Sequence, residues 1–351
     1  MSVAELFDLG LCCPHCRGQL RESRVPAHRL DCASCAREYP VEYDIPDLRL
    51  HPDPYIAMDA DRAKGRRLLD ESGARDWRGM VDFYYRITDT VPPQQAERFL
   101  ASLDRGAIRA ASTLAAWERL AGGATAEGGT LLEVGCGTGP LLLAAARGRT
   151  VVGLDVAFRW LIVCRRRLEE RGVRAPLVCA NAESLPFREA SFDVVASEST
   201  IEVTRDQNLA ATEAFRVLRP GGRIYLTTPN RWSLGPDPHL GVPAGGWWPQ
   251  SWLARWAGRR GALPPRRNLL SRVELGGLLH RAGFRRRRYD LPAVPAEQRR
   301  ALGPMLRAAA TAYDGARRTP VTRHVLFFLG PMLMATASKP SATPPPRAPA
   351  A

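Results

Sequence analysis

The feature that most constrains this chain is a glycine-rich segment at 130–139, T-L-L-E-V-G-C-G-T-G, which joins two apolar stretches. The apolar residues before the glycines predict a buried strand. Because Gly135, Gly137 and Gly139 carry no Cβ, the backbone there can turn sharply and come close to a ligand. Pro140 suits the first turn of a helix, where its missing N–H costs nothing. The segment therefore predicts a strand, a tight turn and a helix whose free N–H groups face a cleft.

The spacing of these glycines differs from the dinucleotide-binding fingerprint G-x-G-x-x-G, whose third glycine would fall at Pro140. The chain instead has G-x-G-x-G, preceded by Glu133. A second predicted strand, at 150–154, is followed by Asp155, sixteen residues past the last glycine. An acid at the tip of this strand is placed to accept hydrogen bonds from both ribose hydroxyls of a nucleoside. The pattern therefore favours a nucleoside ligand and disfavours a nicotinamide oxidoreductase.

Together these features resemble the class I S-adenosylmethionine (SAM)-dependent methyltransferases, of the methyltransferase type 11-like group. Two later segments add to the resemblance: N-A-E-S-L-P-F at 181–187 and F-R-V-L-R-P-G-G-R-I-Y-L-T-T-P-N at 215–230. The resemblance covers roughly residues 76–338. It implies an α/β fold with a Rossmann-like seven-stranded sheet, in which five parallel strands are followed by a terminal antiparallel hairpin.

The resemblance also implies which residues bind SAM. The family motif usually reads G-D-A-x-x-L-P-F, and its acid accepts a hydrogen bond from the adenine amine. Asn181 replaces that acid here, and its amide oxygen can accept the same hydrogen bond. The next backbone N–H, that of Ala182, would donate to the adenine ring. The expected cofactor-binding residues are Glu133, Gly135, Gly137, Gly139, Asp155, Asn181, Ala182 and Ser197.

Methyl transfer from a sulfonium needs an aligned acceptor and excluded water, and it needs a base only where the acceptor must lose a proton. His239, Glu198 and Tyr84 are the candidates for acceptor contact or proton removal. His239 lies in a long segment expected to form a substrate lid, although it can equally fix a turn. Tyr84 lies in the N-terminal helices expected to cover the cofactor, where aromatic packing is the alternative.

Five of the eight cysteines lie near the N-terminus. Cys13, Cys16, Cys32 and Cys35 give the spacing C-x2-C-x15-C-x2-C, a strong zinc pattern, and Cys12 is read as a bystander. Two such turns close a tetrahedron around a structural Zn2+ and leave no position for substrate. The segment looks like the zinc ribbon that serves as a small partner of some tRNA and protein methyltransferases. We expect it to staple a short segment, with substrate recognition as the alternative.

The expected domain organisation follows from these motifs. It comprises a zinc ribbon at 1–50, a linker at 51–75, a methyltransferase domain at 76–338 and a disordered tail at 339–351. The domain is expected to begin with two cap helices, at 94–103 and 107–120. Insertions at 231–270 and 292–331 are expected to carry acceptor specificity.

The net charge of +14 invites a nucleic-acid interpretation. However, Lys64 and Lys339 are the only lysines, and the excess of arginine, with abundant Ala, Gly and Pro, indicates codon bias in a GC-rich genome. The runs at 165–167 and 285–288 are accordingly read as a solvated helix stripe and as alternate faces of a strand. No segment reaches the ~18 apolar residues of a membrane span, and no signal peptide is apparent. We therefore expect a cytoplasmic protein without a membrane partner.

The sequence thus predicts a SAM-dependent methyltransferase that transfers a methyl group to a small-molecule acceptor, such as a secondary metabolite, by in-line displacement. The alternatives are an rRNA or tRNA methyltransferase that uses the ribbon for recognition, and a non-catalytic SAM-binding or scaffold module. The acceptor, the methylated atom and the oligomeric state stay open at this point.

Overall fold

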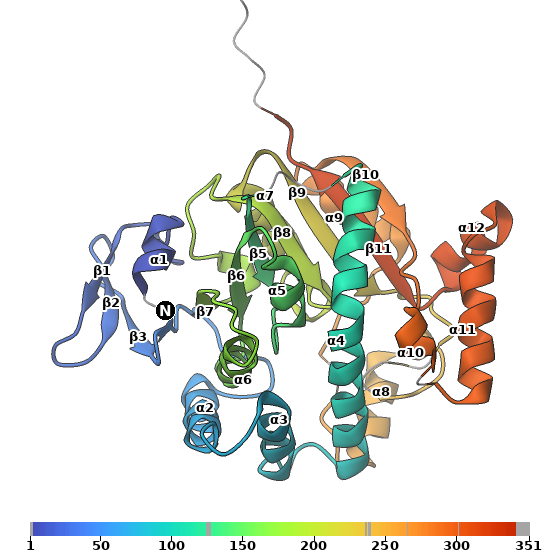
Figure 1. Cartoon of the computed structure of the whole chain (residues 1–351), viewed down its shortest axis with the longest axis horizontal. Helices are drawn as coiled ribbons and strands as arrows, with labels where there is room; N and C mark the ends of the chain where they lie inside the picture. The colour runs from blue at the N-terminus through green and yellow to red at the C-terminus, as the bar shows by residue number, and fades with distance from the viewer. Residues whose placement is uncertain are drawn as a thin grey trace, which may run out of the picture.

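A seven-stranded sheet runs through the centre of the molecule, and a four-stranded antiparallel sheet lies beside it (Figure 1). The computed structural model describes residues 3–123, 128–235, 237, 240–264, 266–300 and 302–341. The strands of the large sheet are β5 (Thr130–Val134), β6 (Thr150–Asp155), β7 (Leu177–Cys179), β8 (Phe192–Glu198), β9 (Leu218–Pro229), β10 (Arg285–Asp290) and β11 (Met332–Ser338).

The order of the strands across the large sheet is β10-β11-β9-β8-β5-β6-β7. Strands β5 to β9 are parallel to their neighbours, as predicted, and β11 runs antiparallel to both β9 and β10. From β5 the chain first adds β6 and β7 on one side and then β8 and β9 on the other, so the direction of strand addition reverses at β5. An open parallel sheet binds its ligands at such a point, outside the carboxyl ends of its strands.

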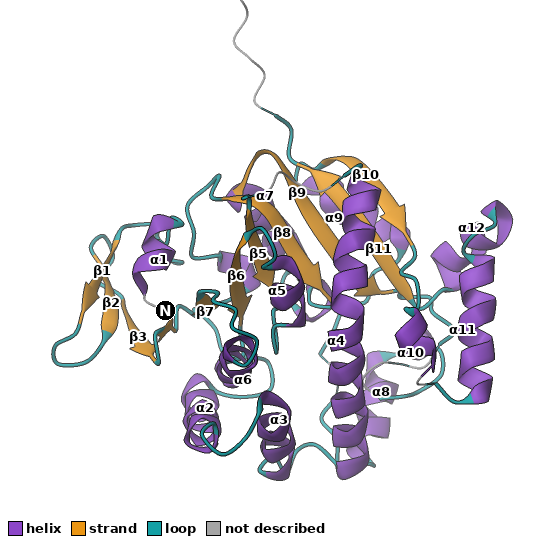
Figure 2. Ribbon diagram, viewed as in Figure 1, coloured by secondary structure: helices purple, strands orange, loops and turns teal. Residues whose placement is uncertain are grey.

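Helices cover both faces of the large sheet (Figure 2). Alternate residues of each strand point to opposite faces, so Leu131 and Leu132 enter different hydrophobic cores. One core holds residues of α7 (Gln207–Val217) and α9 (Arg272–Arg281). The other holds residues of α4 (Pro93–Ala121), α5 (Pro140–Ala145) and α6 (Phe158–Glu169). Both cores fix the strand tips that carry the predicted site.

The N-terminal unit packs on the edge of the large sheet. It comprises α1 (Val3–Asp8), β1 (Leu20–Ser23), β2 (Arg29–Cys32), β3 (Glu38–Glu42) and β4 (Ile45–Pro46). Beyond β4, the N–H of Leu48 donates to the carbonyl of Cys179 at 2.7 Å, so the chain pairs with β7 as it leaves the unit. Leu30 and Tyr39 share a core with Val178 of β7. The hydrophobic core of this short unit is therefore continuous with one of the two cores of the large sheet.

The covering helices differ from the prediction in two places. The cap region forms α3 (Trp77–Arg86) and then one helix of 29 residues, α4, where two helices were expected. The expected solvated stripe at 165–167 is wrong for Arg167, which is buried. Its guanidinium stacks 4.0 Å from the Trp77 ring centroid and donates to Thr138 Oγ1 at 3.0 Å. A charge run on a helix does not reveal that one member packs on an aromatic ring.

The arginine run 285–288 does not alternate between faces either. Arg285 pairs with Ser338 and Arg288 with Thr336, so three steps on β10 oppose two on β11. Arg286 occupies this bulge with φ of 48°, and all four arginines are exposed. A bulge breaks the two-residue period of a strand, which is why the expected alternation fails.

Helices occupy several segments that the sequence left without structure. The range expected as a linker contains α2 (Met58–Glu71), and the two insertions contain α8 (Gln250–Gly258), α10 (Ala296–Arg300), α11 (Pro304–Ala316) and α12 (Pro320–Leu329). Of the tail predicted to be disordered, residues 342–351 lie outside the described part of the chain. Among the described helices, none combines the length and apolarity that crossing a membrane requires.

A buried ion-pair network joins the N-terminal unit to the large sheet. Arg49, whose side chain is fully buried, pairs with Asp47 at 2.6 Å and with Asp61 of α2 at 2.7 Å. Asp61 also pairs with Arg159 of α6 at 2.6 Å, and Arg159 pairs with Asp53 at 3.0 Å. A buried charge without its partner is strongly destabilising, so every member of the network holds the others in place.

We expect Asp61→Ala to lower the free energy of unfolding by about 3–5 kcal/mol, because it leaves Arg49 and Arg159 buried beside a missing partner. The matched control is Asp59→Ala on the same helix, whose side chain is 94% exposed. An exposed pair contributes at most about 1 kcal/mol. Urea unfolding of both variants measures the difference, and equal losses would contradict a structural role for the network.

Candidate functional site

The glycine loop takes the geometry that its sequence predicts. It leaves β5, turns, and enters α5, whose first residue is Pro140. Gly135, Gly137 and Gly139 have φ of 78°, 50° and 74°, a region that residues with a side chain rarely adopt. A Cβ at Gly135 would also overlap the side chain of Thr200. Glycine at this position therefore lets the loop approach the segment that follows β8.

Asp155, at the end of β6, is tied to this loop by its carboxylate. Oδ2 accepts a hydrogen bond from the N–H of Gly137, and Oδ1 accepts one from the N–H of Ala157, both at 2.8 Å. The residue is 9% exposed, and burial raises the pKa of its carboxyl to about 6. Each oxygen keeps a further lone pair, so the carboxylate can still accept hydrogen bonds from a ligand.

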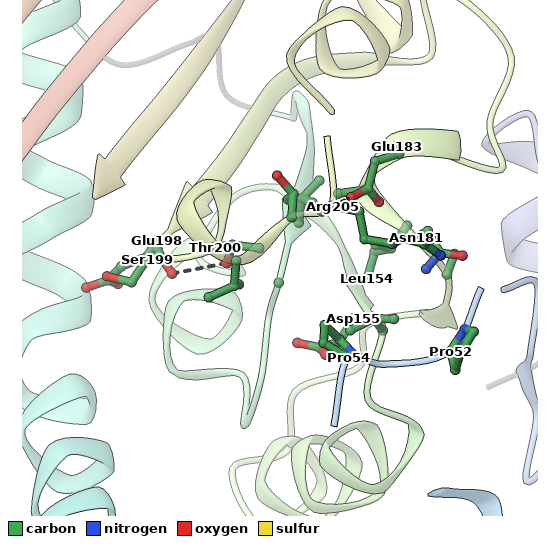
Figure 3. A pocket seen from close by; sticks show the side chains of 17 residues that line it. Pro52, Pro54, Leu154, Asp155, Asn181, Glu183, Glu198, Ser199, Thr200 and Arg205 are labelled. Atoms are coloured by element: carbon green, nitrogen blue, oxygen red, sulfur yellow. Dashed lines mark hydrogen bonds between the residues drawn. The ribbon is translucent and has the colours of Figure 1, made fainter. Parts of the chain in front are cut away.

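One cavity of about 240 Å3 brings several predicted site residues together (Figure 3). Its walls include Gly135, Asp155, Asn181, Ala182 and Glu198, which come from the ends of β5, β6, β7 and β8. The cavity thus lies at the carboxyl ends of the parallel strands, across the place where the chain order reverses. A site of this kind suits a nucleoside.

Four of the predicted cofactor residues are not among those that line this cavity. These four are Glu133, Gly137, Gly139 and Ser197. Glu133 is buried, its Oε2 has no hydrogen-bond partner among the described residues, and burial raises the pKa of its carboxyl well above the usual value. Ser197 lines a small apolar cavity that shares Val134, Ala182 and Thr200 with the first. Their predicted contacts with SAM stay predictions.

Asn181 is engaged with the N-terminal unit. Its Oδ1 accepts hydrogen bonds from the N–H groups of Leu50 at 2.8 Å and His51 at 3.1 Å, and its Nδ2 donates to the His51 carbonyl at 3.1 Å. Two donors occupy both lone pairs of the amide oxygen that was expected to accept from adenine. The adenine contact stays a prediction, and the observed role of Asn181 is to hold the chain just before Pro52.

Pro52 and Pro54 are cavity residues that the sequence did not predict. Both belong to a segment, H-P-D-P, whose composition is typical of a hinge. The Asn181 hydrogen bonds and the Asp53–Arg159 ion pair fix this segment over the mouth of the cavity. The segment that follows the N-terminal unit therefore supplies part of the wall, which local sequence signals do not indicate.

The three catalytic candidates have different outcomes. Glu198 lines the cavity, and its carboxylate pairs with Arg109 of α4 at 2.9 Å. Tyr84 is buried in α3, away from the cavity walls, with its ring 4.7 Å from that of Trp160. Tyr84 thus packs on an aromatic neighbour in this structure, and its contact with an acceptor stays a prediction. His239 lies outside the described residues.

Glu202 is a buried acid that the sequence analysis did not single out. It follows β8, is 2% exposed, and its Oε2 accepts a hydrogen bond from Thr228 at 3.1 Å. Burial raises the pKa of its carboxyl to about 7. Acids with a pKa near neutrality at strand ends are candidates for proton transfer. Its place four residues after Glu198 was the signal that could have indicated it.

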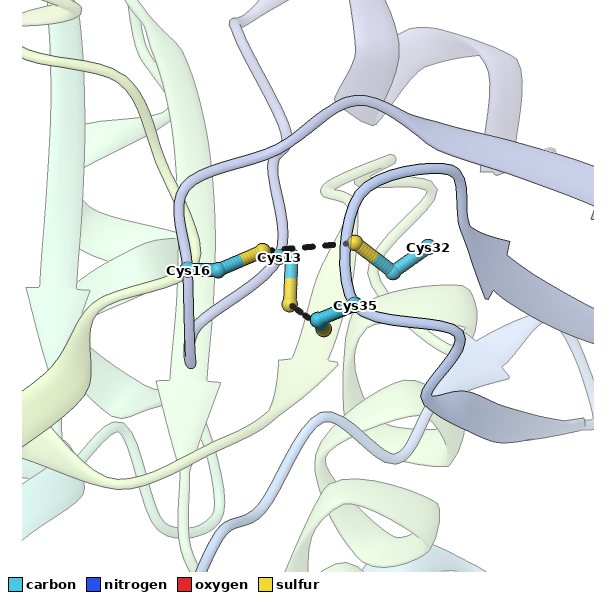
Figure 4. A group of neighbouring side chains, drawn as sticks. All are labelled: Cys13, Cys16, Cys32 and Cys35. Atoms are coloured by element: carbon cyan, nitrogen blue, oxygen red, sulfur yellow. Dashed lines mark hydrogen bonds between the residues drawn. The ribbon is translucent and has the colours of Figure 1, made fainter.

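Four thiols of the N-terminal unit converge on one point (Figure 4). The Sγ atoms of Cys13, Cys16, Cys32 and Cys35 all lie within 4.8 Å of one another. Cys13 and Cys35 are 3.7 Å apart, and Cys16 and Cys32 are 3.4 Å apart. Four ligands at the usual Zn–S distance of about 2.3 Å would stand about 3.8 Å apart in a tetrahedron. The cluster therefore fits a zinc ion, and the Tyr39 hydroxyl lies 3.2 Å from Cys13 Sγ.

Comparison with known proteins agrees with this geometry. Residues 132–226 match a family model described as a methyltransferase domain. The matched region runs from β5 to β9 and so contains the glycine loop, Asp155 and Asn181. This part of the chain therefore matches a methyltransferase domain.

Several curated relatives match the same region. The chain is 39% identical over 110 residues to a probable S-adenosylmethionine-dependent methyltransferase of Mycolicibacterium smegmatis, which covers 31% of this chain and 41% of that protein. It is 38% identical over 117 residues to the nocamycin O-methyltransferase of Saccharothrix syringae, covering 30% and 42%. It is 38% identical over 114 residues to the ubiquinone biosynthesis O-methyltransferase of Idiomarina loihiensis, covering 31% and 47%. The chain thus spans less than half the length of these relatives.

Among solved structures, the chain is similar to phosphoethanolamine N-methyltransferase 2 of Haemonchus contortus in complex with S-adenosyl-L-methionine. The TM-score is 0.44 at 19% identity, and the match covers 66% of this chain and 52% of the other.

We expect Glu202→Gln to stabilise the protein increasingly as pH rises. The folded-state pKa of about 7 lies above the usual value near 4.5, so the unfolded chain releases this proton at a lower pH than the folded protein does. The wild type therefore loses stability as pH rises from about 4.5 to about 7. The gain of the variant should grow by roughly 2–3 kcal/mol between pH 5 and pH 8. Thermal unfolding measures it, with exposed Glu189→Gln as control. A gain that is independent of pH would contradict a neutral buried acid.

Proposed function

We propose that this protein is a SAM-dependent methyltransferase that acts on a small-molecule acceptor. The observation that carries the proposal is the placement of Asp155 between the glycine loop and the cavity, with Asn181 and Glu198 on the neighbouring strand ends. A nucleoside lying across β5 and β6 would have its ribose hydroxyls at Asp155 and its amino-acid portion over the bare backbone at Gly135. The remaining predicted cofactor residues, Glu133, Gly137, Gly139, Ala182 and Ser197, are proposed to contact the bound cofactor as well.

The proposed methyl transfer requires few catalytic groups from the chain itself. SAM, when bound, supplies a methyl group already activated by the positive sulfur. The residues of the chain bind and orient the reactants and exclude water. Where the acceptor must lose a proton, Glu198 is the candidate carboxyl that lines the cavity, whereas the buried Glu202 does not line it. His239 and Tyr84 remain proposed candidates for acceptor contact or proton removal.

The names of two relatives, nocamycin O-methyltransferase and ubiquinone biosynthesis O-methyltransferase, support a small acceptor. The net charge of +14 and the cysteine-rich unit favour the alternative, an RNA methyltransferase. The affinity for an RNA acceptor should fall steeply with rising salt concentration, because its phosphate contacts release counterions on binding. The affinity for a small acceptor should change little.

The first test concerns the cofactor. Asp155→Ala should weaken SAM binding by on the order of 1–3 kcal/mol, because the ribose hydroxyls lose a charged acceptor. In the wild type, affinity should also fall as pH drops through about 6, where the carboxyl protonates. Calorimetric titration with SAM measures both effects, with exposed Asp70→Ala as control. Unchanged affinity in Asp155→Ala would refute this placement of the cofactor.

We also propose that the four N-terminal thiols bind one structural zinc ion, which closes the ribbon through a complete tetrahedron. Elemental analysis should find about one zinc per chain, lost in Cys13→Ser and in Cys35→Ser. Cys12→Ser is the matched control, since Cys12 is buried beside the cluster but is not part of it. A native preparation that is fully folded and free of metal would rule the site out.

A further inference from the structure

A second, larger cavity adjoins the one proposed for SAM. Its volume is about 650 Å3, and it shares Pro52, Pro54 and the segment 203–205 with the smaller cavity. The rest of its wall comes from Gln250, at the start of α8, and from residues 266–268, all within the insertion 231–270. Its size is within the range of small-molecule pockets. The cavity is therefore placed to hold the molecule that receives the methyl group.

The side chains around this second cavity are predominantly cationic. Arg205, Arg266 and Arg267 line it, and Asp53 is the one acid among its described wall residues. Asp53 is itself neutralised, because its carboxylate pairs with buried Arg159 at 3.0 Å. Within the described part of the chain, the guanidinium groups of Arg205 and Arg266 form no ion pair. The wall thus presents two guanidinium groups that form no ion pair with described residues, although the carboxylate of Glu183 lies beside the backbone of Arg205.

Arg267 adds unused hydrogen-bond donors. Its side chain is 1% exposed and pairs with buried Asp237, yet its Nε and Nη1 have no acceptor among the described residues. A buried donor without an acceptor costs free energy, and a ligand that supplies the acceptor removes that cost. The planar guanidinium also matches a carboxylate or phosphate through paired hydrogen bonds.

Backbone hydrogen bonds hold both exposed arginines at the cavity. The N–H of Arg205 donates to Glu183 Oε1 at 2.6 Å, and the N–H of Arg266 donates to the Tyr55 hydroxyl at 2.8 Å. These anchors come from the two sides of the cofactor cavity, the segment after β7 and the segment after the N-terminal unit. These two bonds therefore fix the backbone of both arginines beside the second cavity.

We propose that the acceptor is a small anion, bearing a carboxylate or a phosphate that is bound by Arg205 and Arg266 in this second cavity, with Arg267 beneath them. This inference rests on the proposed function, since it places the acceptor beside bound cofactor. It assigns the insertion 231–270 a role in choosing acceptors by charge. The small volume favours a discrete molecule over an RNA chain.

The test uses the full chain saturated with S-adenosylhomocysteine, with three probes that share a phenyl ring: phenyl phosphate, benzoate and benzyl alcohol. Calorimetry should detect phenyl phosphate or benzoate and find benzyl alcohol at least about tenfold weaker. The two anions distinguish a phosphate from a carboxylate site. Arg205→Gln and Arg266→Gln should each weaken the preferred anion by about tenfold, the loss expected for one charge-assisted hydrogen bond.

The controls separate this inference from the proposed function. Arg259→Gln, an exposed residue at the end of α8, should leave anion binding unchanged. The affinity for S-adenosylhomocysteine should stay within about twofold in Arg266→Gln and Arg259→Gln, because neither residue lines the smaller cavity. Failure of the wild type to bind S-adenosylhomocysteine would sink the proposed function. Normal cofactor binding with no preference for the anions, or with no effect of Arg205→Gln and Arg266→Gln, would overturn the inference alone. Tighter binding of an oligouridylate that these variants abolish would also overturn it, in favour of RNA.

Discussion

The hydrogen bond from the Gly137 N–H to the Asp155 carboxylate is the interaction on which the site depends. It joins the turn after β5 to the tip of β6, and it needs both a glycine with φ of 50° and an acid at the strand end. The parallel register of β5 and β6 brings the two together, with Val134 opposite Leu154. Sheet, loop and acid thus form one unit, and the cavity opens where that unit meets the end of β8.

Contacts with the large sheet and its helices also hold the segment that follows the N-terminal unit. Asn181 and the Asp47–Arg49–Asp61–Arg159 network hold the segment 50–54 against the sheet, and Pro52 and Pro54 then wall both cavities. Contacts of residues 47–54 therefore connect the unit that carries the cysteine cluster to the buried ion-pair network and to the pocket. An asparagine suits position 181, because an amide can both accept from two N–H groups and donate to a carbonyl.

The parts predicted from the sequence are those with local signals. The positive-φ glycines after β5 and the proline at the start of α5 depend on neighbours in sequence, and the structure has them. The sequence analysis did not predict the features that depend on residues distant in the sequence. Arg167 stacks on Trp77, α2 forms around a buried Asp61, and Glu202 acquires its raised pKa from surroundings brought together by β8, β9 and the insertion. No local pattern encodes such contacts.

The central claim is that a nucleoside lies across the tips of β5 and β6, and a crystal structure of the protein with S-adenosylhomocysteine tests it most directly. The account predicts both ribose hydroxyls within hydrogen-bond distance of Asp155, and the adenine beside Pro52 and Ala182. It also predicts that the sulfur points toward the end of β8. Electron density for the ligand elsewhere, or a cavity at Asp155 filled by side chains, would contradict it.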